Sequence, residues 1–152
     1  MYITRITDDQ QKQAIARRIL EALPEWFGIP ESREEYIADS TGRIFFCAME
    51  DEEPIGFLYL KETGAATVEL AVMGVLKTHH RRGVGRALFH HARAAAREAG
   101  YAFLQVKTVQ MGRYPDYDAT NRFYLALGFR EFEVFPTLWD EHNPCQVYVM
   151  AL

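Results

Sequence analysis

The residues with the clearest chemical potential lie in the segment HRRGVGR, where a basic turn leads into a Gly-containing helix start. The first backbone amides of a helix have no partner within that helix, and the helix dipole adds partial positive charge at the same point. Gly83 and Gly85 carry no side chain that would hold an anion away from those amides. Guanidinium groups, which suit phosphate oxygens, surround this point from Arg81, Arg82 and Arg86. The segment therefore predicts a site for a phosphate-bearing ligand.

Two common phosphate-binding patterns are absent from this segment. No G-K-[ST] follows the glycines, as it would in a Walker loop, and the three-glycine spacing of the dinucleotide fingerprint is missing. An ordinary strand-to-helix turn with solvated arginines is the alternative interpretation. The charge distribution favours a ligand, because six Lys and Arg residues and no Asp or Glu lie between Lys77 and Arg97 in a chain whose net charge is −4.

Composition and length indicate a globular protein with a single domain over residues 1–152. Hydrophobic residues make up 49% of the chain and charged residues 25%, which is ordinary for a globular domain. The two cysteines, Cys47 and Cys145, are far apart and form no C-x-x-C pair, so a reducing cytoplasm is the simplest setting. No signal peptide and no apolar run of membrane-spanning length is apparent. The negative net charge argues against a general nucleic-acid binder.

Hydrophobic periodicity and turn residues predict seven strands and four helices. We expect strands at Tyr2–Ile6, Arg43–Met49, Ile55–Leu60, Thr67–Leu76, Phe103–Thr108, Phe129–Phe135 and Gln146–Met150. We expect helices from Asp8 or Asp9 to about Ala22, from a Ser32 cap to about Asp39, and at Val84–Ala99 and Thr120–Leu127. The segments QMGRYPDYD and PTLWDEHNP are predicted to be loops. This order of elements predicts an α+β domain with a mixed sheet.

Two segments resemble the signatures of the GNAT superfamily of acyl-CoA-dependent N-acetyltransferases. HRRGVGRAL resembles the pyrophosphate motif Q/R-x-x-G-x-G/A, and NRFYLALGF resembles the second signature, an FY dipeptide followed by GF. The resemblance covers nearly the whole chain, and the tail FPTLWDEHNPC resembles an ending found in one uncharacterised branch. It implies a three-layer α/β fold, in which about four helices flank a mixed, mostly antiparallel sheet of about seven strands with a splay between strands four and five.

The resemblance also implies acetyl-CoA as the co-substrate. Its pyrophosphate would lie on the backbone from Arg81 to Arg86, which includes Val84. Its acyl carbonyl would meet the fourth strand at Met73 to Val75, where that strand bulges in the family. Gly74 within this apolar strand fits a bulge or a close backbone approach, and simple core packing is the alternative.

Two positions depart from the family pattern. The Q/R position of the first motif falls on His80, which has a shorter side chain. The usual N-x-x-A ahead of the FY pair would fall on Tyr117 and Thr120, so Asn121 becomes the candidate for the cofactor amide contact.

Two side chains are candidates for catalysis. Tyr124 occupies the family's position for the acid that protonates the departing thiolate, and packing against Phe123 is the alternative. Glu69 lies six residues before Val75, as does the base in the histone-acetyltransferase branch. By period two it would share a face with Met73 and Val75 up to any bulge. A solvent-facing position is the alternative for Glu69.

The histidines do not predict a metal site. His79–His80 and His90–His91 are adjacent pairs without Cys or carboxylate partners at ligand spacing, and no helical H-x-x-x-H occurs. We expect surface or phosphate-side roles for them and no metal.

The two tryptophans are candidates for binding the acceptor. Trp26 and Trp139 each lie in an irregular, proline-flanked connection, and in folds of this family the two connections flank the acceptor end of the cleft. Glu25 accompanies the first, and Asp140 and Glu141 the second, which suits a cationic amine. Sealing of small cores under the loops is the alternative.

The sequence therefore supports an acetyl-CoA-dependent N-acetyltransferase that acts on a primary amine of a small molecule or peptide by direct attack. A non-catalytic acyl-CoA sensor is the alternative, although a sensor would not require Tyr124 and Glu69. We expect neither a nucleic-acid nor a membrane partner. The acceptor, the acyl-chain preference and the oligomeric state stay open, with a homodimer as one alternative.

Overall fold

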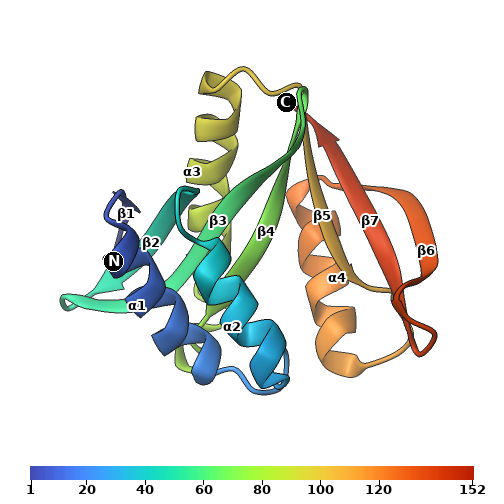
Figure 1. The fold of residues 1–152 in the computed structure, drawn as a ribbon, viewed down its shortest axis with the longest axis horizontal. Helices are drawn as coiled ribbons and strands as arrows, with labels where there is room; N and C mark the ends of the chain where they lie inside the picture. Colours follow the sequence, from blue (N-terminus) through green and yellow to red (C-terminus); the bar gives the residue numbers. More distant parts are fainter.

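A single seven-stranded sheet organises the molecule (Figure 1), and the computed structural model describes residues 1–152. The strand order is β1-β2-β3-β4-β5-β7-β6. The strands are β1 (Tyr2–Ile6), β2 (Ile44–Glu50), β3 (Glu53–Gly64), β4 (Thr67–Val75), β5 (Phe103–Val109), β6 (Arg130–Asp140) and β7 (Asn143–Ala151). The helices are α1 (Asp9–Glu21), α2 (Pro30–Asp39), α3 (Val84–Glu98) and α4 (Pro115–Leu127), and a short 3-10 turn, η1, spans Lys77–His79. Only β4 and β5 pair in parallel, so the predicted mixed, mostly antiparallel sheet is confirmed.

Helices cover both faces of the sheet and give the molecule three layers. Ile19 and Leu20 of α1 and Ile37 of α2 pack with β2 and β3 in one core. Leu88 of α3 and Leu127 of α4 belong to a second, larger core on the opposite face. The apolar stripe of each helix faces the sheet, as helical periodicity requires. No helix in the structure has the length and apolar character needed to cross a membrane.

The central strands β4 and β5 separate soon after they meet. Their parallel pairing is limited to three residue pairs, which are Thr67 with Phe103, Val68 with Leu104 and Glu69 with Gln105. Beyond this point β4 pairs only with β3, whereas β5 pairs only with β7. Figure 1 shows the two strands close together at the top of the view and apart at the bottom. The splay between strands four and five is thus present.

The bulge in β4 lies at Ala71 and not at Gly74, where the sequence pattern favoured it. Val72 pairs with Tyr59 and Leu70 pairs with Leu60, which leaves Ala71 as the extra residue. An extra residue reverses the alternation of side chains beyond it. Ala71 accordingly packs toward α1, while Met73 packs with the α3 core.

Gly74 instead allows α1 to approach the sheet closely. A β-carbon at this position would lie 2.9 Å from Cγ2 of Ile19 and 3.1 Å from Cδ1 of Leu23. Ile19 is fully buried and its branched side chain has little rotamer freedom, so it cannot move aside easily. The alternative interpretation of Gly74, core packing, is therefore the one that the structure supports.

Two helices begin earlier than predicted, each at a proline. α2 starts at Pro30 without a side-chain cap, so Ser32 is not its cap. α4 starts at Pro115, with Asp116 and Asp118 in its first turn, in a segment that we expected to be a loop. Proline is well suited to the first helical turn because its fixed φ fits and its missing N–H has no partner there. Acidic residues in that turn further favour the helix through its dipole.

The segment PTLWDEHNP is not a long loop but the end of a hairpin. β6 continues to Asp140 and β7 begins at Asn143. Asp140 accepts hydrogen bonds from the backbone amides of His142 and Asn143, which closes a tight turn. The local composition predicts a loop, and this carboxylate turn stabilises strands on both sides of it.

We predict that Gly74→Ala lowers the free energy of unfolding by about 1–3 kcal/mol, because overpacking of a filled core costs this much. Denaturant unfolding would measure the change. Gly64→Ala is the matched control, since Gly64 also lies in a strand and a β-carbon there meets no atom within 4 Å. Equal effects of the two substitutions would contradict the close approach of α1.

Candidate active site

The turn between β4 and α3 presents a continuous row of unpaired backbone amides. The amides from Arg81 to Arg86 donate no hydrogen bond within the chain, and the first bond of the helix runs from Ala87 to the carbonyl of Gly83. Gly83 is the N-cap of α3 with φ 79°, and no side chain caps this helix. Arg81 also has a positive φ, 62°. These conformations turn successive N–H groups toward one place, which makes an anion-binding concavity.

Positive side chains surround the same amides without internal partners. Arg81, Arg82 and Arg86 are exposed, and none of them forms an ion pair. Their guanidinium groups are therefore free to reach a phosphate. Unpaired amides and unpaired arginines thus meet at this turn, which is the arrangement that the predicted anion site requires.

The two glycines of this turn have different roles. A β-carbon on Gly83 would meet no atom within 4 Å, so its positive φ is what requires glycine there. A β-carbon on Gly85 would lie 3.0 Å from Cζ of Phe123. Gly85 thus makes room for α4 beside the start of α3, a long-range reason that no pattern in the sequence indicated.

His80 faces back toward β4 and the α1–α2 connection. Its Nε2 hydrogen-bonds the carbonyl of Val75 at 2.7 Å, and its ring lies edge-on to Trp26 with centroids 5.8 Å apart. The hydrogen bond occupies one of the two ring nitrogens, Nε2. In this structure His80 therefore shapes the turn between β4 and α3.

Met73 and Val75 lie where β4 has lost its β5 partner. Met73 pairs with Leu58 and Val75 with Gly56, both on β3. The backbone groups of β4 that point toward β5 have no strand partner beyond Glu69. This open edge can accept an extended ligand through main-chain hydrogen bonds.

Tyr124 is buried on α4, in the core beneath the splay. Only 6% of the residue is exposed, and its hydroxyl makes no hydrogen bond within the chain. Burial raises the pKa of Tyr124 above its usual value, and the neighbouring Tyr117 and the negative charge of Glu69 raise it further. The phenol therefore stays neutral at physiological pH and keeps a proton to donate.

Glu69 forms an ion pair with Lys107 of β5. Glu69 Oε1 lies 2.5 Å from Lys107 Nζ, and both side chains are mostly buried. Because the bulge at Ala71 intervenes, Glu69 does not share a face with Met73 and Val75, as period two alone had predicted. Sequence reasoning missed Lys107, although a lysine within the apolar strand FLQVKTV was a signal for a buried partner.

Asn121 holds α4 against the sheet. It is fully buried, and its Nδ2 donates to the carbonyls of Val109 and Tyr117 while its Oδ1 accepts from the hydroxyl of Tyr148. Both amide hydrogens are used. In this structure Asn121 is a structural residue and leaves no donor for a cofactor.

The two tryptophans lie in different surroundings. Trp26 is partly buried beside His80, and its carbonyl accepts from the hydroxyl of Tyr117, so it joins the turn after β4 to α4. Trp139 is 47% exposed near the β6–β7 turn. Both connections lie along the lower edge of Figure 1, with α4 between them in that view.

The acidic neighbours of both tryptophans have internal partners. Glu25 pairs with Lys77 at 2.6 Å, and Asp140 is held within the hairpin turn by Asn143. Glu141 stays exposed beside His142. No group of three or more His, Cys, Asp or Glu side chains could hold a metal ion.

Known proteins resemble this chain in sequence and in fold. A model of the acetyltransferase (GNAT) domain family matches residues 41–131. The chain is 27% identical over 99 residues to the uncharacterized N-acetyltransferase YsnE of Bacillus subtilis (strain 168), a match that covers 65% of this chain and 64% of that protein. The chain therefore spans less than two thirds of this relative's length.

Two solved structures share the fold. A GNAT-family protein from Desulfovibrio desulfuricans has a TM-score of 0.83 at 23% identity, over 99% of this chain and 98% of that one. The yncA protein of Salmonella typhimurium, determined with its cofactor acetyl-CoA, has a TM-score of 0.77 at 18% identity, over 100% and 94%. The family match runs from β2 to the end of α4 and so includes the splay and the row of unpaired amides. The chain belongs to the GNAT acetyltransferase domain family.

Proposed function

We propose that the chain is an acetyl-CoA-dependent N-acetyltransferase that transfers an acetyl group to a primary amine of a small molecule or peptide. The observation that carries this proposal is the row of unpaired amides from Arg81 to Arg86, which opens beside the free edge of β4. The amides and arginines suit the pyrophosphate of the co-substrate, and the edge from Met73 to Val75 suits its extended arm. Acetyl-CoA supplies the thioester carbon that the amine attacks.

The cysteines support direct attack by the amine. Burial raises the pKa of Cys47 to about 12 and that of Cys145 to about 11. A thiol is a nucleophile only as the thiolate, so neither side chain is suited to carry the acetyl group at neutral pH. Both cysteines are free, which supports the proposal of a reducing, cytoplasmic setting.

Tyr124 and Glu69 would divide the proton transfers. The transfer forms a nitrogen–carbon bond, breaks the carbon–sulfur bond, frees one proton from nitrogen and requires one at sulfur. The neutral phenol of Tyr124 is the proposed donor to sulfur. Glu69, or a water molecule beside it, is the proposed acceptor from nitrogen, with Lys107 fixing the carboxylate. Trp26 and Trp139 stay our proposed contacts for the acceptor.

We predict that Gly83→Val weakens binding of acetyl-CoA by about tenfold or more, about 1.4 kcal/mol. Valine is strained at φ 79° and would disturb the amides on either side. Calorimetric titration with acetyl-CoA would measure the change, and Arg82→Ala should cost less, because the amides stay in place.

Gly42→Val is the matched control for this measurement. Gly42 has φ 77°, and a β-carbon there would meet no atom within 4 Å, so the strain is similar but lies in the turn before β2. Equal loss of affinity in both variants, or none in Gly83→Val, would place the pyrophosphate elsewhere.

We predict that Tyr124→Phe lowers kcat by about 100-fold and leaves the Kd for acetyl-CoA nearly unchanged, because the hydroxyl acts only as sulfur departs. Glu69→Gln should lower turnover most at low pH, where more of the amine is protonated. Since the pKa of Tyr124 is raised, we expect no loss of parent activity from its ionisation up to about pH 10.

Thiol release in the presence of an amine mixture would measure these rates. Tyr101→Phe is the control, since its hydroxyl contacts Glu62 at an exposed site. A parent that binds acetyl-CoA but releases no thiol with any amine would instead support a sensor module.

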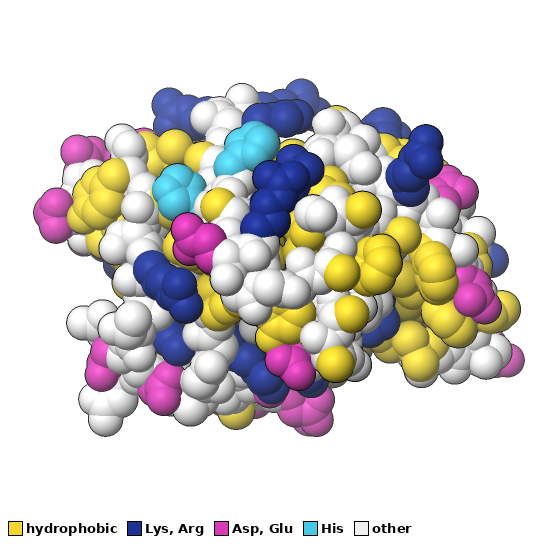
Figure 2. Space-filling model, turned by 90° about the horizontal axis from the view of Figure 1, so that it is seen from above, with side chains coloured by type: hydrophobic (Ala, Val, Ile, Leu, Met, Phe, Trp, Pro, Cys, Tyr) yellow, Lys and Arg dark blue, Asp and Glu magenta, His cyan; other side chains and the backbone are white.

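We propose that a second copy of this chain covers the exposed side of β6. Phe132, Phe135 and Leu138 of β6 are 65%, 37% and 55% exposed. Figure 2 shows hydrophobic side chains gathered on the side of the molecule that carries β6 and β7. A twofold dimer would bury this surface on both chains. A standard interface buries about 800 Å² per partner, and polar residues around the apolar surface would supply the rest of that area.

Light scattering should therefore give the mass of a dimer, and Leu138→Glu should give that of a monomer. Ile29→Glu is the control, because Ile29 is similarly exposed but lies in the α1–α2 connection. A monomeric parent would rule out the dimer.

A further inference from the structure

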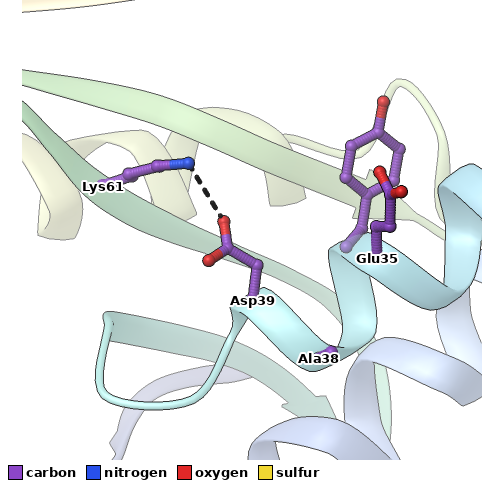
Figure 3. A pocket seen from close by; sticks show the side chains of 5 residues that line it. Glu35, Ala38, Asp39 and Lys61 are labelled. Atoms are coloured by element: carbon purple, nitrogen blue, oxygen red, sulfur yellow. Dashed lines mark ion pairs between the residues drawn. The ribbon is translucent and has the colours of Figure 1, made fainter.

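A hollow of about 550 Å³ lies between α2 and β3, outside the proposed cofactor site. Its lining consists of Glu35, Tyr36, Ala38, Asp39 and Lys61. Figure 3 shows Glu35 and Asp39 on α2 and Lys61 reaching toward Asp39 from the strand. A hollow of this volume is large enough for part of a small organic ligand.

One carboxylate in this hollow has no partner. Asp39 pairs with Arg43 at 2.7 Å and with Lys61 at 3.4 Å. Glu35 is exposed and forms neither an ion pair nor a hydrogen bond, whereas its chain neighbour Glu34 is held by Arg17 of α1. Glu35 is thus the negative charge that the hollow leaves for a ligand.

The ring of Tyr36 adds an aromatic surface next to that charge. Tyr36 is 38% exposed, and the edge contact of Phe27, with centroids 6.0 Å apart, helps to fix its ring. The backbone is fixed as well, since the hydroxyl of Tyr59 donates to the carbonyl of Tyr36 at 2.7 Å. A carboxylate beside an aromatic face favours a cation, through Coulomb attraction and the ring quadrupole.

The hollow adjoins the splay. Lys61, in its lining, pairs in register with Glu69, and Glu69 is the last residue of β4 that pairs with β5. Negative charge on Glu35 and Glu69 raises the pKa of Tyr36 beyond the effect of burial, and the charge of Glu69 also reaches Tyr124. Tyr36 therefore lies near both Glu35 of the hollow and Glu69 of the splay.

We propose that the acceptor is a diamine, whose reacting primary amine lies in the splay while Glu35 and Tyr36 bind its second, cationic group. This inference rests on the proposed function. In the transfer the reacting nitrogen loses its proton and gains the acetyl carbon, while the distal group stays protonated and bound. The second charge would distinguish a diamine from a monoamine of equal length.

Steady-state kinetics with linear diamines and with monoamines of the same chain lengths would test this proposal. We expect lower KM values for diamines. Glu35→Gln should raise the diamine KM by about tenfold and leave the monoamine KM unchanged, since only the distal cation meets this carboxylate. Tyr36→Ala should have a similar effect, and Tyr36→Phe should retain the parent values because the ring, not the hydroxyl, contacts the cation.

Glu34→Gln is the matched control, with the same change of charge on the same helix but on the side facing α1. It should leave every KM unchanged. No preference for diamines in the parent, or equal effects of Glu35→Gln on both classes of amine, would overturn the proposal.

Calorimetric titration of a linear diamine into the protein separates this inference from the proposed function. Absence of thiol release with every amine would refute the acetyltransferase activity alone. Diamine binding that Glu35→Gln weakens would still support the hollow as a cation site, and absence of diamine binding to the parent would overturn it.

Discussion

The brief parallel contact between β4 and β5 is the constraint on which the rest of the site depends. Three residue pairs join the strands, and after Glu69 and Gln105 each strand has its other neighbour as its only partner. A strand in the middle of a sheet normally hydrogen-bonds its backbone N–H and C=O groups to the strands on both sides. Here the edge of β4 stays open in the middle of the molecule, so a ligand can take the place of a strand.

Separate contacts hold the two arms of the splay apart. On one side, Gly74 lets α1 pack closely against β4, and the bulge at Ala71 redirects the strand. On the other, Asn121 ties the end of β5 to α4 through the carbonyl of Val109. Since each strand is fixed by its own helix, β4 and β5 stay apart without a bound ligand.

The α1–α2 connection links the proposed acceptor side to the amides at the start of α3. Glu25 pairs with Lys77, and Trp26 packs against His80, which in turn bonds the carbonyl of Val75. These contacts fix the turn from which the amides project. The same connection reaches α4, because the hydroxyl of Tyr117 donates to the carbonyl of Trp26. A change at Trp26 would therefore affect both substrates of the proposed reaction.

Much of the fold, and the turn geometry of the proposed anion site, could be predicted from the sequence, because both depend on local patterns. Hydrophobic periodicity located all seven strands and four helices, and the turn HRRGVGR carries the glycine and the arginines that an anion site needs. The predicted boundaries of helices and strands were wrong where one local sequence signal is compatible with two structures. Proline began α2 and α4 where it was taken as part of a connection, and Asp140 closed a hairpin within a segment of loop-like composition.

By itself the sequence determined the family, the strand–turn–helix at Gly83 and the helical position of Tyr124, since each follows from neighbouring residues or from periodicity. Only the tertiary structure decided what Gly74, Asn121, Glu69 and Glu35 do. Gly74 faces a helix from a distant part of the chain, and Asn121 bonds two strands. Glu69 meets Lys107 across the splay, whereas Glu35 has no partner at all. Whether a polar side chain is free or paired depends on long-range contacts, which no local pattern in the chain encodes.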